Sequence, residues 1–172
     1  MYLGEDSFFM SEFLGNYLKD KDKKIKILDL GSGRGIQAET CINLGFKDIT
    51  ASDIGEEEIN YLKNKFKNIK IIKSDLFSNI QEKFDLIIFN PPYLPESRYD
   101  SRRDTTGGKF GDEIIFRFLE QAGNHLNENG EIILLLSSFT PRNKIKKLKW
   151  KIKKLDEKSL FFEKLEICQL KK

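Results

Sequence analysis

Apolar and polar positions along this chain follow two alternating patterns. Short apolar runs of strand length recur at 24–30, 48–52, 69–74, 84–89, 131–137, 150–155 and 160–170. Apolar residues at every third or fourth position predict helices within 1–18 and at 36–44, 56–65, 112–126 and 142–148. Strands that alternate with helices favour a parallel sheet covered on both faces, and the last two runs predict an antiparallel pair at its edge. The predicted fold class is α/β, with a seven-stranded, mostly parallel sheet.

The stretch 84–93, FDLIIFNPPY, ends one of these strands abruptly. Its apolar run is typical of a strand buried on both faces. Neither Pro91 nor Pro92 can donate a hydrogen bond to a sheet, so the chain must leave the sheet after Asn90. The amide of Asn90, a rigid backbone carbonyl and the ring of Tyr93 then lie at the carboxyl end of a core strand, where open α/β sheets bind ligands. The alternative is a strand that ends in a stiff loop without a function.

A glycine-rich turn, DLGSGRG, leads from the first predicted strand into the next helix. Gly31, Gly33 and Gly35 permit backbone angles closed to other residues and let a ligand approach the main chain. The dinucleotide pattern G-x-G-x-x-G would need a glycine where Ile36 stands, which weakens a pyrophosphate interpretation. Asp29 precedes the turn, and a carboxylate facing the pocket there would suit a cationic ligand rather than a phosphate.

Two further predicted strands end in aspartate. Asp53 ends the second strand, near where α/β nucleoside sites place an acid that holds both ribose hydroxyls. Asp75 ends the third strand and could accept a hydrogen bond from an adenine amino group, with the main chain of Leu76 beside it. Taken singly, each acid is more simply explained as a capping or turn residue. Because the carboxyl ends of parallel strands meet at one edge, these acids, Asp29 and Asn90 together predict one ligand pocket.

Composition narrows the class of protein. The chain has 172 residues, of which 39% are hydrophobic and 33% charged, as expected for one globular domain with its own core. A net charge of +3 permits an anionic partner without requiring one. We find no apolar run of membrane-spanning length and no signal-peptide pattern. The expectation is a cytoplasmic protein with reduced thiols.

Few residues are suited to metal or covalent chemistry. Cys41 and Cys168 are too few for a disulfide framework and wrongly spaced for a zinc ribbon, so we expect small core residues. The single histidine, His125, lies late in a predicted helix, which favours a surface or helix-end position over a catalytic one. No metal site is expected in this chain alone. The lysine-rich segment 144–154 is interpreted as a solvated face over an edge strand in preference to an RNA contact.

These motifs resemble those of class I S-adenosylmethionine-dependent methyltransferases. More narrowly, the chain resembles the short, HemK-like protein-glutamine N5-methyltransferases of archaea and eukaryotes, which modify class I translation release factors. The resemblance covers nearly the whole chain and rests on Tyr2, Glu5–Phe8, Asp29–Gly35, Asp53, Asp75-Leu76, Asn90–Tyr93, Gly107-Gly108 with Gly111, and Leu160–Glu163. It implies a single Rossmann-like domain over 1–172, with an N-terminal lid helix in 1–18 and no separate substrate domain.

The resemblance also implies a cofactor site, carried over residue by residue. Asp29 and Gly31 would contact the methionine part of S-adenosylmethionine, in the loop that contains Gly33 and Gly35. Ser7 would close over this part of the cofactor.

The nucleoside part of the cofactor would be held by the later strand ends. Asp53 would hold the ribose, and Asp75 with Leu76 would hold the adenine. Two departures from the family pattern concern the lid and the substrate rim. Leu3-Gly4 stands where the family often has a proline, and Thr105-Thr106 stands where it often has a tryptophan.

Asn90-Pro91-Pro92-Tyr93 narrows the methyl acceptor to a planar amino group, as in glutamine, adenine or guanine. Our hypothesis is that the side-chain oxygen of Asn90 and the carbonyl of Pro91 accept the two N–H bonds of the acceptor. Pro92 would stiffen the turn and Tyr93 would pack on the amide plane. This chemistry needs no metal.

The implied substrate is the glutamine of the Gly-Gly-Gln motif in a class I release factor. The implied partner is a small zinc-binding activator that pairs with an exposed edge strand. We expect that edge at 68–74, near Ile69–Ser74, where the strand is apolar. An unpaired apolar edge is an aggregation liability, so a partner that covers it is physically reasonable. Arg98, Arg102 and Arg103 are candidates for substrate contact. Neither membrane attachment nor direct nucleic-acid binding is expected.

Other activities stay open on the sequence alone. A methyltransferase acting on adenine or guanine in RNA or DNA would share the Asn-Pro-Pro-Tyr chemistry, but the chain has no added nucleic-acid-binding domain and only a mild basic excess. Methylation of protein lysine is a further alternative. A non-catalytic methyltransferase-like subunit is disfavoured because every cofactor and acceptor position is filled. A nicotinamide oxidoreductase is disfavoured by Ile36 and by the lack of an obvious catalytic pair.

Overall fold

The computed structural model describes residues 4–92, 112–138, 140, 145, 147–161 and 163–172. Its helices are α1 (Glu5–Tyr17), α2 (Ile36–Asn43), α3 (Glu56–Lys65) and α4 (Glu113–Ala122), followed by the 3-10 helix η1 (Gly123–His125). Its strands are β1 (Ile27–Leu30), β2 (Ile49–Asp53), β3 (Lys70–Lys73), β4 (Phe84–Phe89), β5 (Leu126–Ser137), β6 (Lys151–Ser159) and β7 (Lys164–Lys171).

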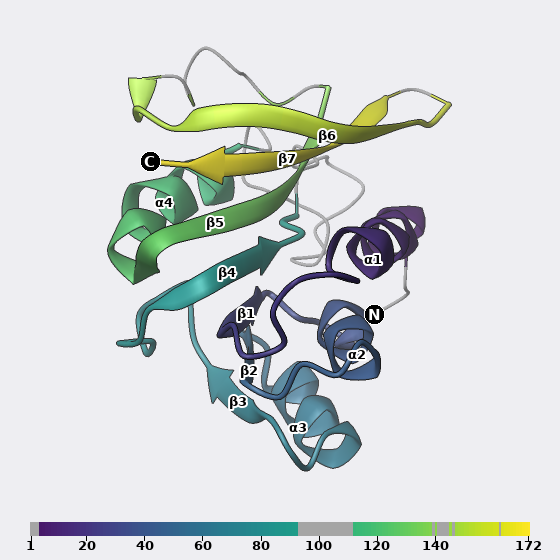
Figure 1. The fold of residues 1–172 in the computed structure, drawn as a ribbon, viewed down its shortest axis with the longest axis vertical. Coiled ribbons are helices and arrows are strands. Elements are labelled where there is room, and N and C mark those ends of the chain that lie inside the picture. Colours follow the sequence, from purple (N-terminus) through teal and green to yellow (C-terminus); the bar gives the residue numbers. More distant parts are fainter. Residues whose placement is uncertain (1–3, 93–111, 139, 141–144, 146, 162) are drawn as a thin grey trace.

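The strands form one seven-stranded sheet in the order β3-β2-β1-β4-β5-β7-β6 (Figure 1). Strands β1 to β5 pair in parallel, and β7 runs antiparallel to both of its neighbours. The predicted fold class and the antiparallel pair at one edge are therefore confirmed. The direction of winding reverses between β1 and β4, and sheets of this kind bind ligands at the carboxyl ends of the strands beside such a switch point.

Helices cover both faces of the sheet (Figure 1). On one face, Met10 of α1, Cys41 of α2 and Leu62 of α3 belong to one buried apolar cluster. On the other face, Ile115 and Phe118 of α4 belong to a second cluster. Successive residues of the central strands alternate between the two clusters, as the period of a strand requires. The sheet is thus the middle layer, and the polar groups of the site can emerge only at its edges and strand ends.

Local sequence features account for where the helices begin and end. Helix α2 stops before Gly45, whose φ of 90° suits the left-handed position after a helix. Helix α3 has three glutamates in its first turn and Lys63 and Lys65 in its last turn. These charges complement the helix dipole at both ends. The predicted bounds of α3 are confirmed, and those of α2 differ by one residue.

Other boundaries differ from the predictions. The helix expected over 112–126 ends at Ala122 and continues as η1, and β5 begins at Leu126 rather than at 131. The polar segment 127–130 has no apolar alternation, so its pairing could not be read from the pattern. A register irregularity lies between the Phe84 and Leu86 pairings of β4 with this part of β5. Most of the helix predicted over 142–148 lies outside the described residues.

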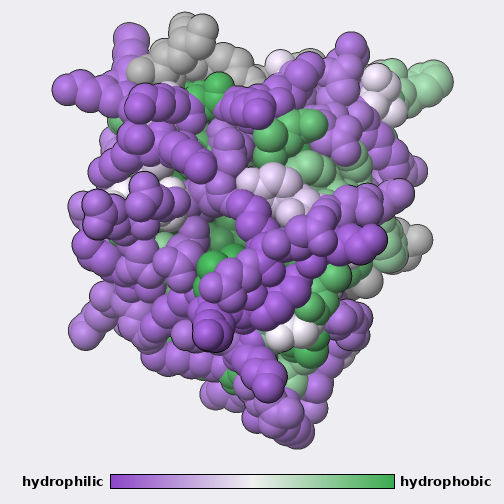
Figure 2. Space-filling view, in the orientation of Figure 1, coloured by the Kyte–Doolittle hydropathy of each residue, from purple (hydrophilic) through white to green (hydrophobic). Residues whose placement is uncertain are grey.

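The surface is largely polar. Figure 2 shows a face covered mostly by hydrophilic side chains. Lys151, Lys153 and Lys154 are exposed on β6, which is an edge strand, in agreement with the predicted solvated lysine face. In the part of the chain that the structure describes, no helix has the length and apolar character needed to cross a bilayer.

Candidate functional site at the carboxyl ends of the strands

The ends of four parallel strands lie level with one another. The parallel registers pair Leu30 of β1 with Phe89 of β4 and with Ser52 of β2. They also pair Asp53 of β2 with Lys73 of β3. The residues that follow these strands therefore share one edge of the sheet, as the sequence predicted.

The glycine loop needs its glycines for backbone geometry and for packing. Gly31, Gly33 and Gly35 have φ values of 65°, 52° and 74°, in the left-handed region that favours glycine. A Cβ on Gly35 would lie 2.6 Å from the ring of Phe66 and 2.7 Å from Leu62 Cδ2. Gly35 therefore serves the contact between α2 and the end of α3 as well as the loop. Its direct contact with a cofactor stays a prediction.

Asp53 connects the glycine loop to the loop after β2. Its Oδ2 accepts a hydrogen bond from the Gly33 amide at 2.8 Å, and its Oδ1 accepts one from the Gly55 amide at 2.9 Å. Ser32 adds a second connection to β2, because its amide donates to the Ser52 carbonyl at 2.8 Å. A carboxylate oxygen can accept more than one hydrogen bond, so Asp53 keeps acceptor capacity for a ribose. The sequence indicated the position of Asp53 but not the role of Ser32.

The carboxylate of Asp29 contacts the start of α2. Its side chain is buried, and Oδ2 accepts a hydrogen bond from the Ala38 amide at 3.0 Å. Ala38 lies in the first turn of α2, where backbone amides lack partners within the helix. Burial raises the pKa of Asp29 to about 7. Asp29 therefore fixes the start of α2, and a contact with the methionine part of the cofactor stays a prediction.

The turn after β3 is held by two serines. The Ser74 hydroxyl donates to the Leu76 carbonyl at 2.8 Å, and the Ser78 hydroxyl accepts from the Asp75 amide at 3.2 Å. Leu76 has a φ of 48°, which a branched residue adopts only where its surroundings enforce it. The carboxylate of Asp75 receives a hydrogen bond from Arg117 Nη2 at 2.8 Å. This exposed ion pair with α4 was not predicted, and an adenine amino group would have to share the carboxylate.

Asn90 has the most informative environment at this edge. Its Nδ2 donates to Asp6 Oδ2 at 3.0 Å and to the Ser7 hydroxyl at 3.4 Å. Its Oδ1 is buried and has no hydrogen-bond partner among the described residues. An unsatisfied buried acceptor costs about 1–3 kcal/mol, so its retention calls for an explanation. Sequence reasoning missed the role of Asp6, which is 84 residues from Asn90 and has no local signal for this contact.

The amino end of α1 is also joined to α2. Gln37 Nε2 donates to the Ser7 carbonyl at 3.1 Å. The side chain of Gln37 is buried, and within the described ranges its Oε1 finds no hydrogen-bond partner. Pro91 is buried and Pro92 half-buried directly after Asn90. Ser7 thus lies beside Asn90, which is compatible with its predicted place over the cofactor.

Several predicted residues lie outside the described part of the chain. They are Tyr93, the arginines Arg98, Arg102 and Arg103, Tyr2, Leu3, Thr105-Thr106, Gly107-Gly108 and Gly111. Their predicted roles stay predictions.

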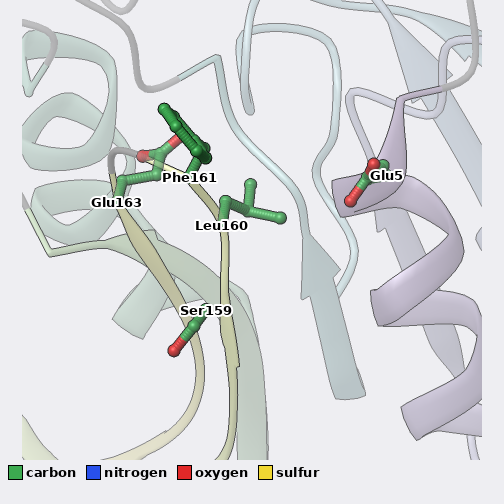
Figure 3. Close-up of a pocket in the computed structure, with 5 residues that line it drawn as sticks. All are labelled: Glu5, Ser159, Leu160, Phe161 and Glu163. Atoms are coloured by element: carbon green, nitrogen blue, oxygen red, sulfur yellow. The ribbon is translucent and has the colours of Figure 1, made fainter.

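A pocket of about 450 Å³ opens between the start of α1 and the turn from β6 to β7. Figure 3 shows the residues that line it, which are Glu5, Ser159, Leu160, Phe161 and Glu163. Ser137 at the end of β5 pairs with Leu165 at the start of β7, so this pocket lies at the same edge of the sheet as Asn90. Phe161 is 93% exposed there.

The remaining reactive side chains lie away from the site. His125 stacks on Phe77 with ring centroids 4.3 Å apart, and its Nδ1 lies 3.1 Å from the Glu82 carbonyl. Cys41 and Cys168 are buried in different clusters on the two faces of the sheet. The predicted structural positions of both cysteines are confirmed. Within the described residues, no group of three or more His, Cys, Asp or Glu side chains is arranged to hold a metal ion.

Comparisons with known proteins identify the family and agree with the fold. A family model described as "methyltransferase small domain" matches residues 9–161. The chain is 36% identical over 177 residues to a Methanocaldococcus jannaschii protein named "putative protein N5-glutamine methyltransferase", covering 95% of this chain and 87% of the relative. A release factor glutamine methyltransferase of Rhodopirellula baltica is 32% identical over 130 residues, covering 64% of this chain and 44% of that relative.

Solved structures share the fold at lower sequence identity. A chain of the E. cuniculi Mtq2–Trm112 complex superposes with a TM-score of 0.77 at 20% identity, covering 100% of this chain and 98% of that chain. The T. thermophilus 16S rRNA N2 G1207 methyltransferase RsmC, solved with AdoMet and guanosine, gives 0.72 at 18% identity, covering 99% and 44%.

The sheet order and the polar carboxyl edge define a class I methyltransferase fold. The chain belongs to the methyltransferase small domain family and is an S-adenosylmethionine-dependent methyltransferase.

The residues at this edge fit S-adenosylmethionine. At the switch point between β1 and β4, the glycines with left-handed backbone angles carry no side chains. A ligand can therefore approach the main chain there. Asp53 offers carboxylate oxygens to hydroxyl groups, and the neighbouring Ile54 is 59% exposed, an apolar surface that a planar ring can cover. These groups match the polar and apolar parts of this cofactor.

Proposed function

We propose that this enzyme methylates the side-chain amide nitrogen of the glutamine in the Gly-Gly-Gln motif of a class I translation release factor. The observation that carries the proposal is the unpartnered Oδ1 of Asn90, an acceptor placed where the Asn-Pro-Pro-Tyr segment leaves the sheet. The M. jannaschii and R. baltica relatives, both named as glutamine methyltransferases, support the choice of acceptor.

The proposed cofactor contacts follow the strand ends. Gly31 and the loop around it would take the methionine part, with Ser7 over it. Asp53 would accept hydrogen bonds from the ribose hydroxyls. Asp75 and Leu76 would hold the adenine amino group and ring edge. When bound, S-adenosylmethionine supplies an electrophilic methyl group on a positively charged sulfonium.

Asn90 and Pro91 would prepare the acceptor for methylation. A glutamine amide nitrogen is a weak nucleophile because its lone pair is delocalised into the carbonyl. Asn90 Oδ1 and the Pro91 carbonyl would each accept one of its N–H bonds and hold the nitrogen in line for methyl transfer. Their fixed dipoles would also stabilise the positive charge that the nitrogen gains. Methyl transfer would leave S-adenosylhomocysteine as the cofactor product, and the methylated nitrogen would release one of its two original protons to solvent.

The Asn-Pro-Pro-Tyr segment would keep this geometry rigid. Pro92 would hold the turn after Pro91, because its ring restricts the backbone there. Tyr93, which lies outside the described residues, would pack on the plane of the acceptor amide.

A small zinc-binding activator is the proposed partner, and the β3 edge is its proposed docking strand. Strand β3 ends the sheet, and its central residues Ile71 and Ile72 are half-buried between Lys70 and Lys73. An edge with two partly apolar side chains favours strand addition by another chain. The solved E. cuniculi neighbour is a complex with Trm112, which supports a partner of this kind. A chain that alone is monodisperse and fully active would contradict the need for a partner.

The test uses the purified chain with and without the activator, labelled S-adenosylmethionine, and three acceptors. These are a release factor with Gly-Gly-Gln, the same factor with Gln→Ala, and total RNA. We expect label on the release factor that disappears in the Gln→Ala control. Label on RNA alone would overturn the proposal in favour of base methylation. The T. thermophilus neighbour is named as an enzyme of that kind, a 16S rRNA N2 G1207 methyltransferase. Label on the Gln→Ala control would instead indicate another protein residue, such as lysine.

A further inference from the structure

We propose that Asp6 is a positioning residue for methyl transfer, whose carboxylate orients the Asn90 amide so that Oδ1 faces the acceptor nitrogen. The inference rests on the proposed function, because it assigns Asn90 Oδ1 to the acceptor. It concerns a residue of α1 whose carboxylate accepts a hydrogen bond from Asn90 Nδ2 at 3.0 Å, its one side-chain hydrogen bond with the site among the described residues.

The chemistry of the contact decides which way the amide points. An asparagine side chain has one donor end and one acceptor end of nearly the same shape. An ionised carboxylate can only accept, so Asp6 favours the orientation with Nδ2 toward α1 and Oδ1 away from it. The Ser7 hydroxyl, at a longer 3.4 Å, can donate or accept and cannot make this distinction. With the amide reversed, an N–H donor would face the N–H donors of the acceptor.

The same contact should strengthen the acceptor. A hydrogen bond from Nδ2 to a charged carboxylate is stronger than one to a neutral group. It polarises the amide and places more negative charge on Oδ1, since hydrogen bonds in a chain reinforce one another in a low-dielectric site. Oδ1 is buried, so this effect is weakly screened by solvent. Asp6 would therefore help to stabilise positive charge on the acceptor nitrogen without touching it.

The backbone at the start of α1 makes room for this carboxylate. Gly4 precedes the helix, and a Cβ added there would lie 2.3 Å from Asp6 Oδ1. Gly4 has an extended backbone, with φ −81° and ψ 168°, which other residues also adopt. A methyl group at this position should therefore displace the Asp6 carboxylate without straining the backbone. The glycine at position 4 thus leaves the space that the Asp6 carboxylate occupies.

The kinetic test is a double-mutant cycle in release factor methylation with Asp6→Ala, Asn90→Ala and the double variant. We expect Asp6→Ala to lower kcat about tenfold, the loss of one charge-assisted hydrogen bond, with the cofactor Kd and KM nearly unchanged. In the Asn90→Ala background, Asp6→Ala should cause no further loss, because it acts through Asn90. A further tenfold loss in that background would overturn the inference, and so would wild-type turnover of Asp6→Ala.

Two further variants separate orientation from folding. Gly4→Ala keeps the carboxylate but displaces it, and should lower kcat by about threefold, an intermediate effect. Glu12→Gln removes a negative charge from an exposed position of the same helix and should leave kcat unchanged. A fall in kcat for Glu12→Gln as large as that for Asp6→Ala would indicate a general charge effect and overturn the inference.

A readout without turnover keeps the inference testable if the release factor is not the substrate. The side-chain amide resonance of Asn90 can be assigned from its absence in Asn90→Ala. We expect its amide protons to exchange more slowly with solvent in the wild-type chain than in Asp6→Ala, and to be unaffected by Glu12→Gln. Equal exchange in wild type and Asp6→Ala would overturn the inference. Lack of wild-type activity on the release factor, with slowed exchange retained, would contradict the proposed function alone.

Discussion

The two ends of α1 contact two polar clusters. The clusters differ in how many of their hydrogen-bonding groups have a partner. At its carboxyl end, Glu131 Oε1 accepts hydrogen bonds from the Tyr17 hydroxyl and Lys21 Nζ, both at 2.9 Å. Glu131 Oε2 accepts one from Gln169 Nε2 at 2.6 Å. We call Tyr17, Lys21, Glu131 and Gln169 the amino-edge cluster, because Glu131 pairs with Leu86 near the start of β4.

The carboxyl-edge cluster consists of Asp6, Ser7, Gln37 and Asn90. The buried Asp29 of β1 holds the start of α2, the helix that carries Gln37. In the carboxyl-edge cluster, Asn90 Oδ1 and Gln37 Oε1 are buried without hydrogen-bond partners in the described structure. Both clusters hold helices to the sheet. Only the carboxyl-edge cluster leaves acceptors open, at a cost in stability that a bound ligand can remove.

The pKa values of Glu131 and Asp29, a buried acid at each edge of the sheet, show the same contrast. Burial acts to raise the pKa of Glu131, but the hydrogen bonds from Lys21 and Tyr17 outweigh it, so the pKa lies below its ordinary 4.5. For Asp29, burial dominates over the hydrogen bonds from Ala38 and Ser32, and the pKa rises to about 7. A satisfied acid stabilises the fold in its charged form, whereas a poorly compensated one stabilises it in its protonated form. The amino edge therefore serves the stability of the fold, whereas the carboxyl edge holds polar groups whose hydrogen-bonding capacity is left for a ligand.

The largest expected effect is on the pH dependence of stability. Between about pH 4 and pH 7, Asp29 holds its proton in the folded chain and has lost it in the unfolded chain. Its contribution is therefore fully present below its ordinary pKa of 3.8 and is lost as the pH rises toward 7, a change on the order of 4 kcal/mol. Asp29→Asn should remove this fall, as measured by urea unfolding from pH 4.5 to 7.5.

The control for this experiment is Asp20→Asn, which changes an exposed aspartate. It should leave the pH dependence as in the wild type. Glu131 acts in the opposite direction, because its contribution is present above pH 4.5 and declines as the pH falls below that value. Parallel stability curves for the wild type and Asp29→Asn would show that burial of Asp29 does not control its protonation.

Asn90→Ala should separate activity from stability at the carboxyl edge. Turnover should fall about a hundredfold, while cofactor affinity stays near the wild-type value. The free energy of unfolding should change by less than about 1 kcal/mol, because the lost hydrogen bonds are offset by removal of an unsatisfied acceptor. Methylation kinetics and urea unfolding measure the two effects, with the exposed Asn124→Ala as the matched control. Near-wild-type turnover would contradict the assignment of Asn90.

Glu131→Ala should give the reverse result at the amino edge. The Tyr17 hydroxyl and the Gln169 amide then lose the carboxylate that accepts their hydrogen bonds. We expect this loss to lower the free energy of unfolding by about 2 kcal/mol and Tm by about 6 °C. Turnover of the folded enzyme should stay near the wild-type value. Lys21→Gln should cost only about 0.5 kcal/mol, since Lys21 is partly exposed. The control is the exposed Glu128→Ala, and equal losses for Glu131→Ala and Glu128→Ala would remove the distinction.

Much of the carboxyl edge could be predicted because strand ends have local signals. The apolar run before Asn90, the prolines after it and the aspartate at position 53 each marked where a strand stops. The directions of the carboxylates had no such signal. Asp29 turns toward α2 and Asp75 toward Arg117, because each depends on a donor from a helix whose placement is set by the whole fold.

Local patterns along the chain were enough to predict most of the helices and strands and the shared edge at which strand-end residues gather. These follow from periodicities of two and 3.6 residues and from proline and glycine, all of which act over a few neighbouring positions. The sheet order, the Asp6–Asn90 contact and the cluster around Glu131 were found in the folded structure and had no local signal. Tyr17 and Glu131 are 114 residues apart, and Asp6 and Asn90 are 84 apart. Such pairs form only when packing of α1 on the sheet brings both partners together, and no local pattern records which polar groups will meet.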